Sequence, residues 1–318
     1  MNRLPIEKRA QILTLMTEGT SLRAISRIVG CSINTVTKLL VDLGEACSDY
    51  QDRALRDLPC TTIEADEIWS FCYSKARNVP DEHVGEFGYG DVWTWTAICA
   101  DTKLIPSWLV GERTIDDAVL FLGDLKARIP HRIQLSTDGL SVYRTAIGMT
   151  FGRDIDWAIM EKQYGRDPAP DSQRRYSPAV CTGVKVRQGK GNPDPSRIST
   201  SYVERSNLTM RMNMRRFTRL TNAHSKKVEN HAAAVAIHFM HYNFGRPHQS
   251  LALKQENGPT IKRSPAMAAG VTDHIWTPEE IVRLLDQPQA PTIAPEPSRK
   301  PNRARERHEH RPASPRPN

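Results

Sequence analysis

Three acidic residues stand where a carboxylate could do chemistry. Asp66 lies inside a stretch of β-branched and aromatic residues that predicts a strand, and Asp138 directly follows a short hydrophobic strand pattern. Glu204 opens a long and strongly basic helical pattern. Burying a carboxylate without a partner is costly, so acids in such positions predict a cation beside them. Three converging carboxylates would form a site for a divalent metal such as Mg²⁺, which prefers oxygen ligands.

Each of these acids also has a simpler structural interpretation. Asp66 has the acidic neighbours Glu64 and Glu67, and an acid in such a strand can simply face solvent. Asp138 precedes a glycine, and this dipeptide is common in turns. Glu204 follows a serine at the spacing of a capping box. Taken singly, none of the three acids is specific for a metal site.

The helix that Glu204 begins makes the pattern more specific. This helix is predicted from Tyr202 to Leu220, and at helical spacing Asn207, Arg211 and Arg215 share the face of Glu204. Solvated charged faces usually mix acids with bases, whereas this one is almost purely basic. Its cations suit phosphate groups. The residues of this segment that we expect to contact nucleic acid are Arg205, Asn207, Arg211, Arg215 and Arg216.

The first fifty residues predict a helix-turn-helix. A tight turn between two helices needs a small, a flexible and an aliphatic residue at fixed places, and Ser26, Gly30 and Val36 supply them. The third helix then presents short hydrogen-bonding groups and one cation, which suit the major groove of DNA. These residues are Ser32, Asn34, Thr35, Thr37 and Lys38. A three-helix packing module without DNA contact is the alternative.

A mixed α/β sheet is predicted to follow the helices. The expected elements are strands at 61–73, 91–101, 104–111 and 132–137 and helices at 114–129 and 140–147. A turn at 101–103 predicts that the second and third strands form an antiparallel hairpin. From about residue 152 to 200 the pattern weakens, and we interpret this segment as an insertion.

The charge distribution predicts a polyanionic partner. The chain has 318 residues and a net charge of +8. Residues 201–227 hold seven basic residues and one acidic residue, a net charge of +6, and residues 287–318 hold seven and three, a net charge of +4. The rest of the chain is slightly acidic. Such concentration of cations is typical of proteins that bind nucleic acid.

Other classes of protein are disfavoured. The most hydrophobic helical pattern holds an uninterrupted apolar run of only six residues, Ala232–Ile237, so no membrane span or membrane partner is expected. Without a signal-peptide pattern, a cytoplasmic, nucleoid-associated protein is expected. The six cysteines are at least twelve positions apart, which predicts free thiols. His231, His238 and His241 lie on an Ala-rich helix and are interpreted as packing residues.

The motifs around the three acids resemble a known family. ADEIWSF, STDGLSVY and YVERSNLTMRMNMRRFTRL are similar to segments of the transposases of the insertion sequence one family, which belong to the DDE superfamily and have a ribonuclease-H-like fold. The resemblance runs from about Thr61 to Phe244, and the segment HYNFGRPHQSL at its end is similar to the closing segment of several related transposases. Two features depart from the family. Asp138 and Glu204 are separated by 65 residues, more than in compact relatives, and the cysteine pairs of a zinc module are lacking.

The resemblance implies a DNA transposase. Asp66, Asp138 and Glu204 are then both catalytic residues and metal ligands, and they hold two Mg²⁺ ions per active site, for which Mn²⁺ is expected to substitute. The implied partner is double-stranded DNA, as terminal inverted repeats and as target, bound by a dimer or higher oligomer. Two alternatives stay open: a helix-turn-helix transcription regulator without catalysis, and a ribonuclease-H-fold nuclease without strand transfer.

The expected fold class is therefore α/β, with an all-α helix-turn-helix ahead of a ribonuclease-H-like mixed sheet flanked by helices. The predicted domain organisation has four parts. These are a helix-turn-helix domain at 1–50, a catalytic domain at 58–250 with its insertion at about 152–200, a short helical extension at 251–286, and a disordered basic Pro/Arg-rich tail at 287–318.

Overall fold

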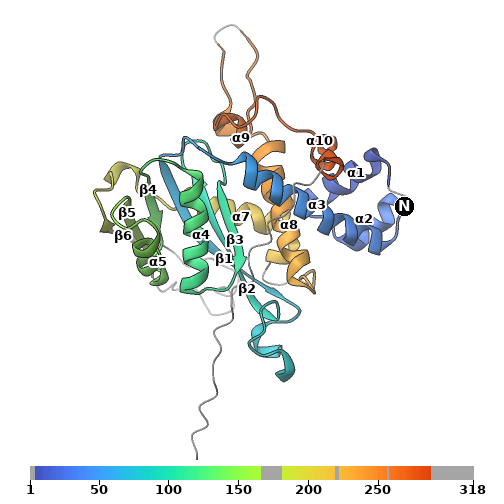
Figure 1. The fold of residues 1–318 in the computed structure, drawn as a ribbon, viewed down its shortest axis with the longest axis horizontal. Coiled ribbons are helices and arrows are strands. Elements are labelled where there is room, and N and C mark those ends of the chain that lie inside the picture. The colour runs from blue at the N-terminus through green and yellow to red at the C-terminus, as the bar shows by residue number, and fades with distance from the viewer. Residues whose placement is uncertain (1–3, 166–180, 219–221, 256–257, 288–318) are drawn as a thin grey trace, which may run out of the picture. The chain divides into compact units, whose positions relative to one another are not determined.

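The strand patterns around Asp66 form the centre of a six-stranded mixed sheet in the computed structural model (Figure 1), which describes residues 4–165, 181–218, 222–255 and 258–287. The strands lie in the order β3-β2-β1-β4-β5-β6. Their bounds are β1 (Thr62–Cys72), β2 (Gly90–Cys99), β3 (Ser107–Gly111), β4 (Gln134–Thr137), β5 (Asp156–Tyr164) and β6 (Cys181–Lys190). β1 pairs with β4, and β4 with β5, in parallel, while the other neighbours are antiparallel.

Helices cover both faces of this sheet. Because side chains alternate along a strand, successive residues of β1 face different helices. On one face, Trp95 of β2 packs against Phe121 of α4 (Ile115–Arg128) and Tyr143 of α5 (Val142–Thr150), with ring centroids 5.9 and 5.6 Å away. Helices α7 (Ser201–Asn213) and α8 (Val228–Met240) contact the other face. The predicted sheet flanked by helices is thus confirmed.

The N-terminal helices have helix-turn-helix geometry. They are α1 (Ile6–Thr17), α2 (Leu22–Val29) and α3 (Ile33–Ala54), and α2 and α3 are bent by 115°. At the turn Gly30 is left-handed with φ of 68°, a conformation that glycine adopts without strain. The Ser26 hydroxyl donates a 2.6 Å hydrogen bond to the carbonyl of Cys31, and Val36 is fully buried. The residues that predicted the turn therefore build it.

Helix α3 extends past the predicted domain boundary at residue 50 and packs on α8. The close approach requires Gly44, since a Cβ there would lie 2.4 Å from the Cβ of Ala233. The C-terminal extension holds two short helices, α9 (Pro265–Ala268) and α10 (Pro278–Arg283). A capping box formed by Thr277 and Glu280 begins α10. Beyond α10, Asp286 accepts an ion pair from Arg9 of α1 at 3.3 Å.

Two segments differ from the sequence prediction. β5 and β6 lie within the expected insertion yet belong to the sheet. Trp157, Ala158 and Ile159 of β5 are buried beside β4, and β6 pairs with β5. Helix α7 ends at Asn213 rather than Leu220, because Met214 takes an extended conformation (φ −128°, ψ 104°) and a 3₁₀ turn, Arg215–Phe217, follows. Leu220, part of the insertion (166–180) and the basic tail (288–318) lie outside the described residues.

The structure also bears on the expected free cysteines and the expected lack of a membrane span. All six cysteines are free. No single helix in the described part of the chain is long and apolar enough to cross a membrane, although α2 and α3 together, bent at their turn, meet the length and composition that a span requires.

Candidate functional site

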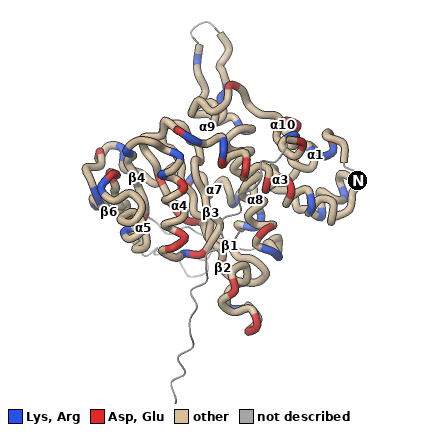
Figure 2. The backbone as a smooth tube through the Cα atoms, viewed as in Figure 1, with Lys and Arg blue, Asp and Glu red and all other residues tan. Residues whose placement is uncertain are grey.

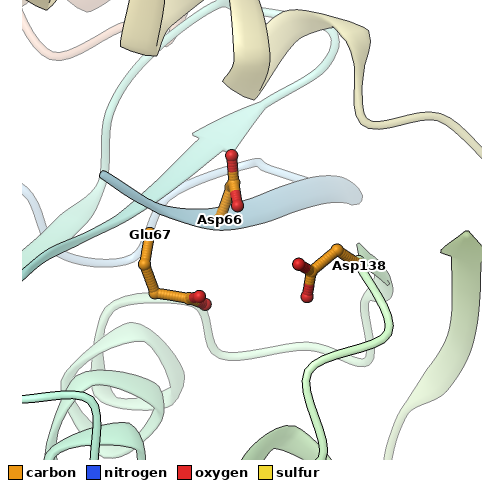
Figure 3. Close-up of side chains that lie close together, drawn as sticks. All are labelled: Asp66, Glu67 and Asp138. Atoms are coloured by element: carbon orange, nitrogen blue, oxygen red, sulfur yellow. The ribbon is translucent and has the colours of Figure 1, made fainter. Parts of the chain in front are cut away.

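Three carboxylates meet in the middle of the sheet, where β4 ends beside β1. Asp66, Glu67 and Asp138 each place one carboxylate oxygen so that all three atoms lie within 4.8 Å of one another (Figure 3). We call these residues the acidic centre. Like charges at this distance repel one another, so the arrangement favours either a bound proton or a cation. The sequence predicted two of its members, Asp66 and Asp138.

Asp66 lies near the middle of β1 and faces α7. Its Oδ2 atom accepts a 2.8 Å hydrogen bond from the side-chain amide of Asn207, which is itself buried. Burial, followed by the charges of Asp138 and Glu204, raises the pKa of Asp66 to about 6. Because Asp66 is covered in part by α7 and bonded to Asn207, it is not simply a solvent-facing strand residue.

Asp138 directly follows β4. The register that pairs Ala65 with Thr137 brings Asp138 level with Asp66, because the two strands run in parallel. Its Oδ1 atom accepts a 2.9 Å hydrogen bond from the backbone amide of Leu140, so the predicted turn role is present as well. The turn role and membership of the acidic centre are therefore compatible.

Glu67 points to the opposite face of β1 from Asp66, toward α5. Its side chain is fully buried, and its Oε2 atom accepts a 3.2 Å ion pair from Arg113, whose guanidinium stacks 4.5 Å over the ring of Trp93. Burial first, then the charges of Asp138 and Asp66, raises the pKa of Glu67 to about 8, against the opposing effect of its neighbours Tyr143 and Arg113. Glu67 is not among the site residues predicted from the sequence.

Glu204 lies outside the acidic centre. It accepts a 2.8 Å hydrogen bond from the hydroxyl of Thr200 and forms an ion pair with Lys162 of β5. Thr200, not Ser201, precedes the first helical residue, and its side chain makes no capping bond, so the capping box suggested by the sequence does not form. Glu204 is nevertheless near enough for its charge to raise the pKa of Asp66.

A second acid of β1 fixes the helix that carries Glu204. The Glu64 carboxylate is buried, and its Oε2 atom accepts hydrogen bonds of 2.7 and 3.0 Å from the backbone amides of Tyr202 and Val203. These amides belong to the first turn of α7, where helical amides lack partners within the helix. Burial, opposed by these bonds, raises the pKa of Glu64. Glu64 thus ties α7 to the strand that carries Asp66.

The predicted nucleic-acid contacts differ in their surroundings. On α7, Arg205 is exposed and Asn207 is buried against Asp66. Arg211 is half-buried, and Arg215 is exposed on the 3₁₀ turn beyond the end of α7, not on the helical face of Glu204. Arg216 donates 2.8 Å hydrogen bonds to the hydroxyl of Ser225 and to the carbonyl of Asn230, so its guanidinium is part of the packing.

On the helix-turn-helix, most of the predicted contacts make local bonds. Ser32 caps α3 through the amide of Thr35, at 3.1 Å, and Thr37 donates to the carbonyl of Ile33. Lys38 pairs with Asp42 at 2.7 Å on the solvent side of the helix. Asn34 is exposed in the first turn of α3.

A groove joins the helix-turn-helix to the end of α7. It measures about 810 Å³, and no Asp or Glu lines it among the described residues. Its cationic lining residues are Arg23, Arg215, Arg216 and Lys226, and we call the groove the basic groove. Gly19 forms a close contact here, since a Cβ on it would lie 2.9 Å from the carbonyl oxygen of Asn213. Figure 2 shows basic residues along the N-terminal helices.

The chemistry of the acidic centre fits a divalent cation. Its donors are carboxylate oxygens, which suit Mg²⁺ and Mn²⁺. One oxygen of Glu67, Oε1, is buried without a hydrogen-bond partner among the described residues, as is Oδ1 of the neighbouring Asn207. Buried polar atoms without partners are costly, and a bound cation would satisfy them.

Comparison with known proteins gives little further guidance. No family model matches the chain, and no curated protein does. Among solved structures, a chain in the crystal structure of a pre-cleavage Mos1 transpososome is 9% identical and has a TM-score of 0.20. The match covers 76% of this chain and 79% of that one. At this level of similarity, function has to follow from the residues of this chain.

Proposed function

We propose that the chain is a DNA transposase of the DDE type, which cleaves the ends of its element and joins the resulting 3′-hydroxyl to target DNA. The observation that supports this most is the proximity of Asp66, near the middle of β1, to Asp138, at the end of the adjacent parallel strand β4, beside the helix that bears Glu204 and Asn207. Two acids on adjacent strands with a third on a neighbouring helix are suited to metal-assisted phosphodiester chemistry.

In this proposal Asp66, Asp138 and Glu204 hold two Mg²⁺ ions, with Mn²⁺ as a substitute. When bound, such ions stabilise the attacking and leaving oxygens of an in-line displacement and activate the nucleophile. Asn207 orients the carboxylate of Asp66 through its 2.8 Å hydrogen bond. To bind a metal ion, the Glu204 carboxylate must break its ion pair with Lys162. The Lys162 ammonium can then bind a phosphate of the DNA.

DNA binding is assigned to two surfaces. The exposed first turn of α3, with Ser32, Asn34 and Thr35, reads the ends of the element, and the basic groove binds the sugar-phosphate backbone. The absence of acidic lining among the described residues of the groove supports a polyanionic ligand. Since transposition joins two ends, the active species is a dimer or larger.

The test uses the full chain and a duplex that carries the DNA flanking its gene. With Mg²⁺, the wild type is expected to release a 3′-hydroxyl at the element end and to join it to a second duplex. Asp66→Ala, Asp138→Ala and Glu204→Ala should each abolish cleavage while end binding survives, whereas Asp91→Ala, at an exposed acid of β2, should cleave normally.

The products also separate the other two functions. Cleavage without joining would indicate a nuclease, and specific binding without any cleavage would indicate a transcription regulator. Normal cleavage by Asp138→Ala would contradict the assignment of the acids themselves.

A further inference from the structure

Glu67 is a buried acid on the face of the sheet that packs against α4 and α5, among mostly apolar neighbours. Its neighbours on this face include Ala65 of β1 and Trp95 of β2, both fully buried, and Tyr143 of α5 packs on Trp95 with 5.6 Å between ring centroids. An aliphatic side chain would fill this position without the desolvation cost of a carboxylate. The ion pair with Arg113 explains how the charge is tolerated, but not why an acid occupies this position.

Arg113 accounts for only one of the two carboxylate oxygens. Both of its hydrogen bonds, from Nε and Nη2, go to Oε2 of Glu67 at 3.3 and 3.2 Å. The guanidinium is held in turn over the ring of Trp93. The other oxygen, Oε1, is buried and accepts no hydrogen bond of 3.5 Å or less among the described residues, although the buried hydroxyl of Tyr143 lies near enough to this carboxylate to interact with it. The side chain is thus fixed in position with one acceptor left over.

The carboxylate of Glu67 extends beyond the edge of its strand toward Asp138. Figure 3 shows it below β1, on the opposite side from Asp66, with the Asp138 carboxylate pointing into the same space. One oxygen from each of the three residues lies within a 4.8 Å cluster. The acidic centre therefore brings three carboxylates together, and Arg113 supplies only one positive charge. A divalent cation would neutralise the remaining negative charge.

We infer that Glu67 is an additional ligand of the metal centre, which binds the ion held by Asp66 and Asp138 from the opposite face of β1. This inference rests on the proposed function for the presence of the metal. Arg113 then has an outer role, since it orients the carboxylate through Oε2 while Oε1 remains available to the ion. The centre consists of four carboxylates once Glu204 joins it.

Metal binding by the full chain, freed of metal with a chelator, tests this without any DNA. Titration calorimetry with Mn²⁺ compares the wild type with Glu67→Gln, which keeps the size of the side chain but removes its charge, and with Asp66→Asn. Asp124→Asn serves as the control, because Asp124 also pairs with an arginine, Arg128 at 2.8 Å, on another part of the molecule. Circular dichroism and thermal melting without metal check that each variant folds.

We expect Glu67→Gln to weaken Mn²⁺ binding by about tenfold or more, Asp66→Asn by at least as much, and Asp124→Asn not at all. If Glu67→Gln fails to fold, Glu67→Asp keeps the charge but shortens the reach by one methylene and should weaken binding similarly. Wild-type affinity in the folded Glu67 variant, with loss in Asp66→Asn, would overturn the role of Glu67 alone. A wild type that binds no Mn²⁺ would overturn the metal of the proposed function as well.

Discussion

The acidic centre and the basic groove hold their charges in different ways. Each acid in or beside the centre is fixed by a neighbour: Asp66 by Asn207, Glu67 by Arg113 and Asp138 by the amide of Leu140. In the basic groove, Arg23, Arg215 and Lys226 are exposed. The acids are thus held in place and partly or fully buried, whereas three of the four cations of the groove are open to solvent.

This difference matches the two tasks that the proposal assigns. A metal ion requires oxygens at set positions, so its ligands gain from being held before the ion arrives. A DNA backbone presents a row of phosphates whose attraction is screened by salt and tolerates movement of the cations. Changes in the acidic centre should therefore abolish chemistry, whereas changes in the basic groove should weaken binding by degrees.

The largest effect is expected from Asp66→Asn. The substitution removes the charge of a metal ligand but keeps the size of the side chain and an oxygen acceptor. Mg²⁺-dependent cleavage should therefore fall by roughly 10³-fold or more. The dissociation constant for end DNA, measured by fluorescence anisotropy, should stay within about threefold of the wild type. Equal losses in binding and cleavage would contradict the assignment of cleavage to the acidic centre and of DNA binding to the basic groove.

The converse experiment reverses two cations of the groove. Arg23→Glu combined with Lys226→Glu should weaken binding of a mixed-sequence duplex by about tenfold or more and lower the salt slope by about 2, because each phosphate contact contributes about 1. Cleavage at saturating DNA should change little. The control pair, Lys185→Glu with Arg153→Glu, changes the net charge equally at exposed positions away from the groove. Equal weakening by both pairs would assign the effect to net charge alone.

A third prediction concerns the link between β1 and α7. Glu64→Ala removes the acceptor of the Tyr202 and Val203 amides, and two buried donors without partners should lower the free energy of unfolding by about 3 kcal/mol. Glu64→Gln retains a carbonyl acceptor and should lose about 1 kcal/mol or less. Urea denaturation gives both values. Equal stability of the two variants would show that this cap does not hold the helix.

The smallest effect concerns His231, which lies 3.4 Å from Ser225 at the base of the groove and 3.2 Å from Ser70. Burial, and then the charge of Arg216, lowers the pKa of His231 to about 3. The folded protein keeps this histidine neutral, while the unfolded chain takes up a proton below about pH 6.5. Its contribution to stability is therefore complete above pH 6.5 and is lost as the pH falls toward 3.

Between pH 7 and pH 5 this histidine should cost the wild type about 2 kcal/mol of unfolding free energy that His231→Gln does not lose. Urea denaturation of both proteins at the two pH values measures the difference. An identical pH response in the variant would contradict a neutral, buried His231.

The sequence predicted the parts of the site that follow from strand order. Asp66 and Asp138 were found because one acid lay within a strand pattern and the other directly after one, and parallel pairing then brings them together. Glu67 is not predicted, because neighbouring acids in a strand pattern are also typical of a strand that faces solvent. Because side chains alternate along β1, Asp66 and Glu67 point to opposite faces of the sheet. Both carboxylates nevertheless lie near Asp138, beside the end of β4.

Features that depend on tertiary contacts could not be predicted. Helix α7 ends at Asn213 although neither glycine nor proline marks its end. Glu64 looked like a surface acid, and its role as the cap of α7 requires that helix to dock on β1, which no local pattern encodes. The basic groove likewise depends on Gly19 meeting Asn213 from a distant part of the chain.

The most direct test of the central claim is a single reaction with the wild-type chain, a duplex carrying the DNA that flanks its gene, a second duplex as target, and Mg²⁺. The proposal predicts a nick that leaves a 3′-hydroxyl at the element end, followed by a joined product that links this end to the target, and loss of both products with Asp66→Asn. Joined products that form without a divalent cation, or that persist with Asp66→Asn, would contradict it.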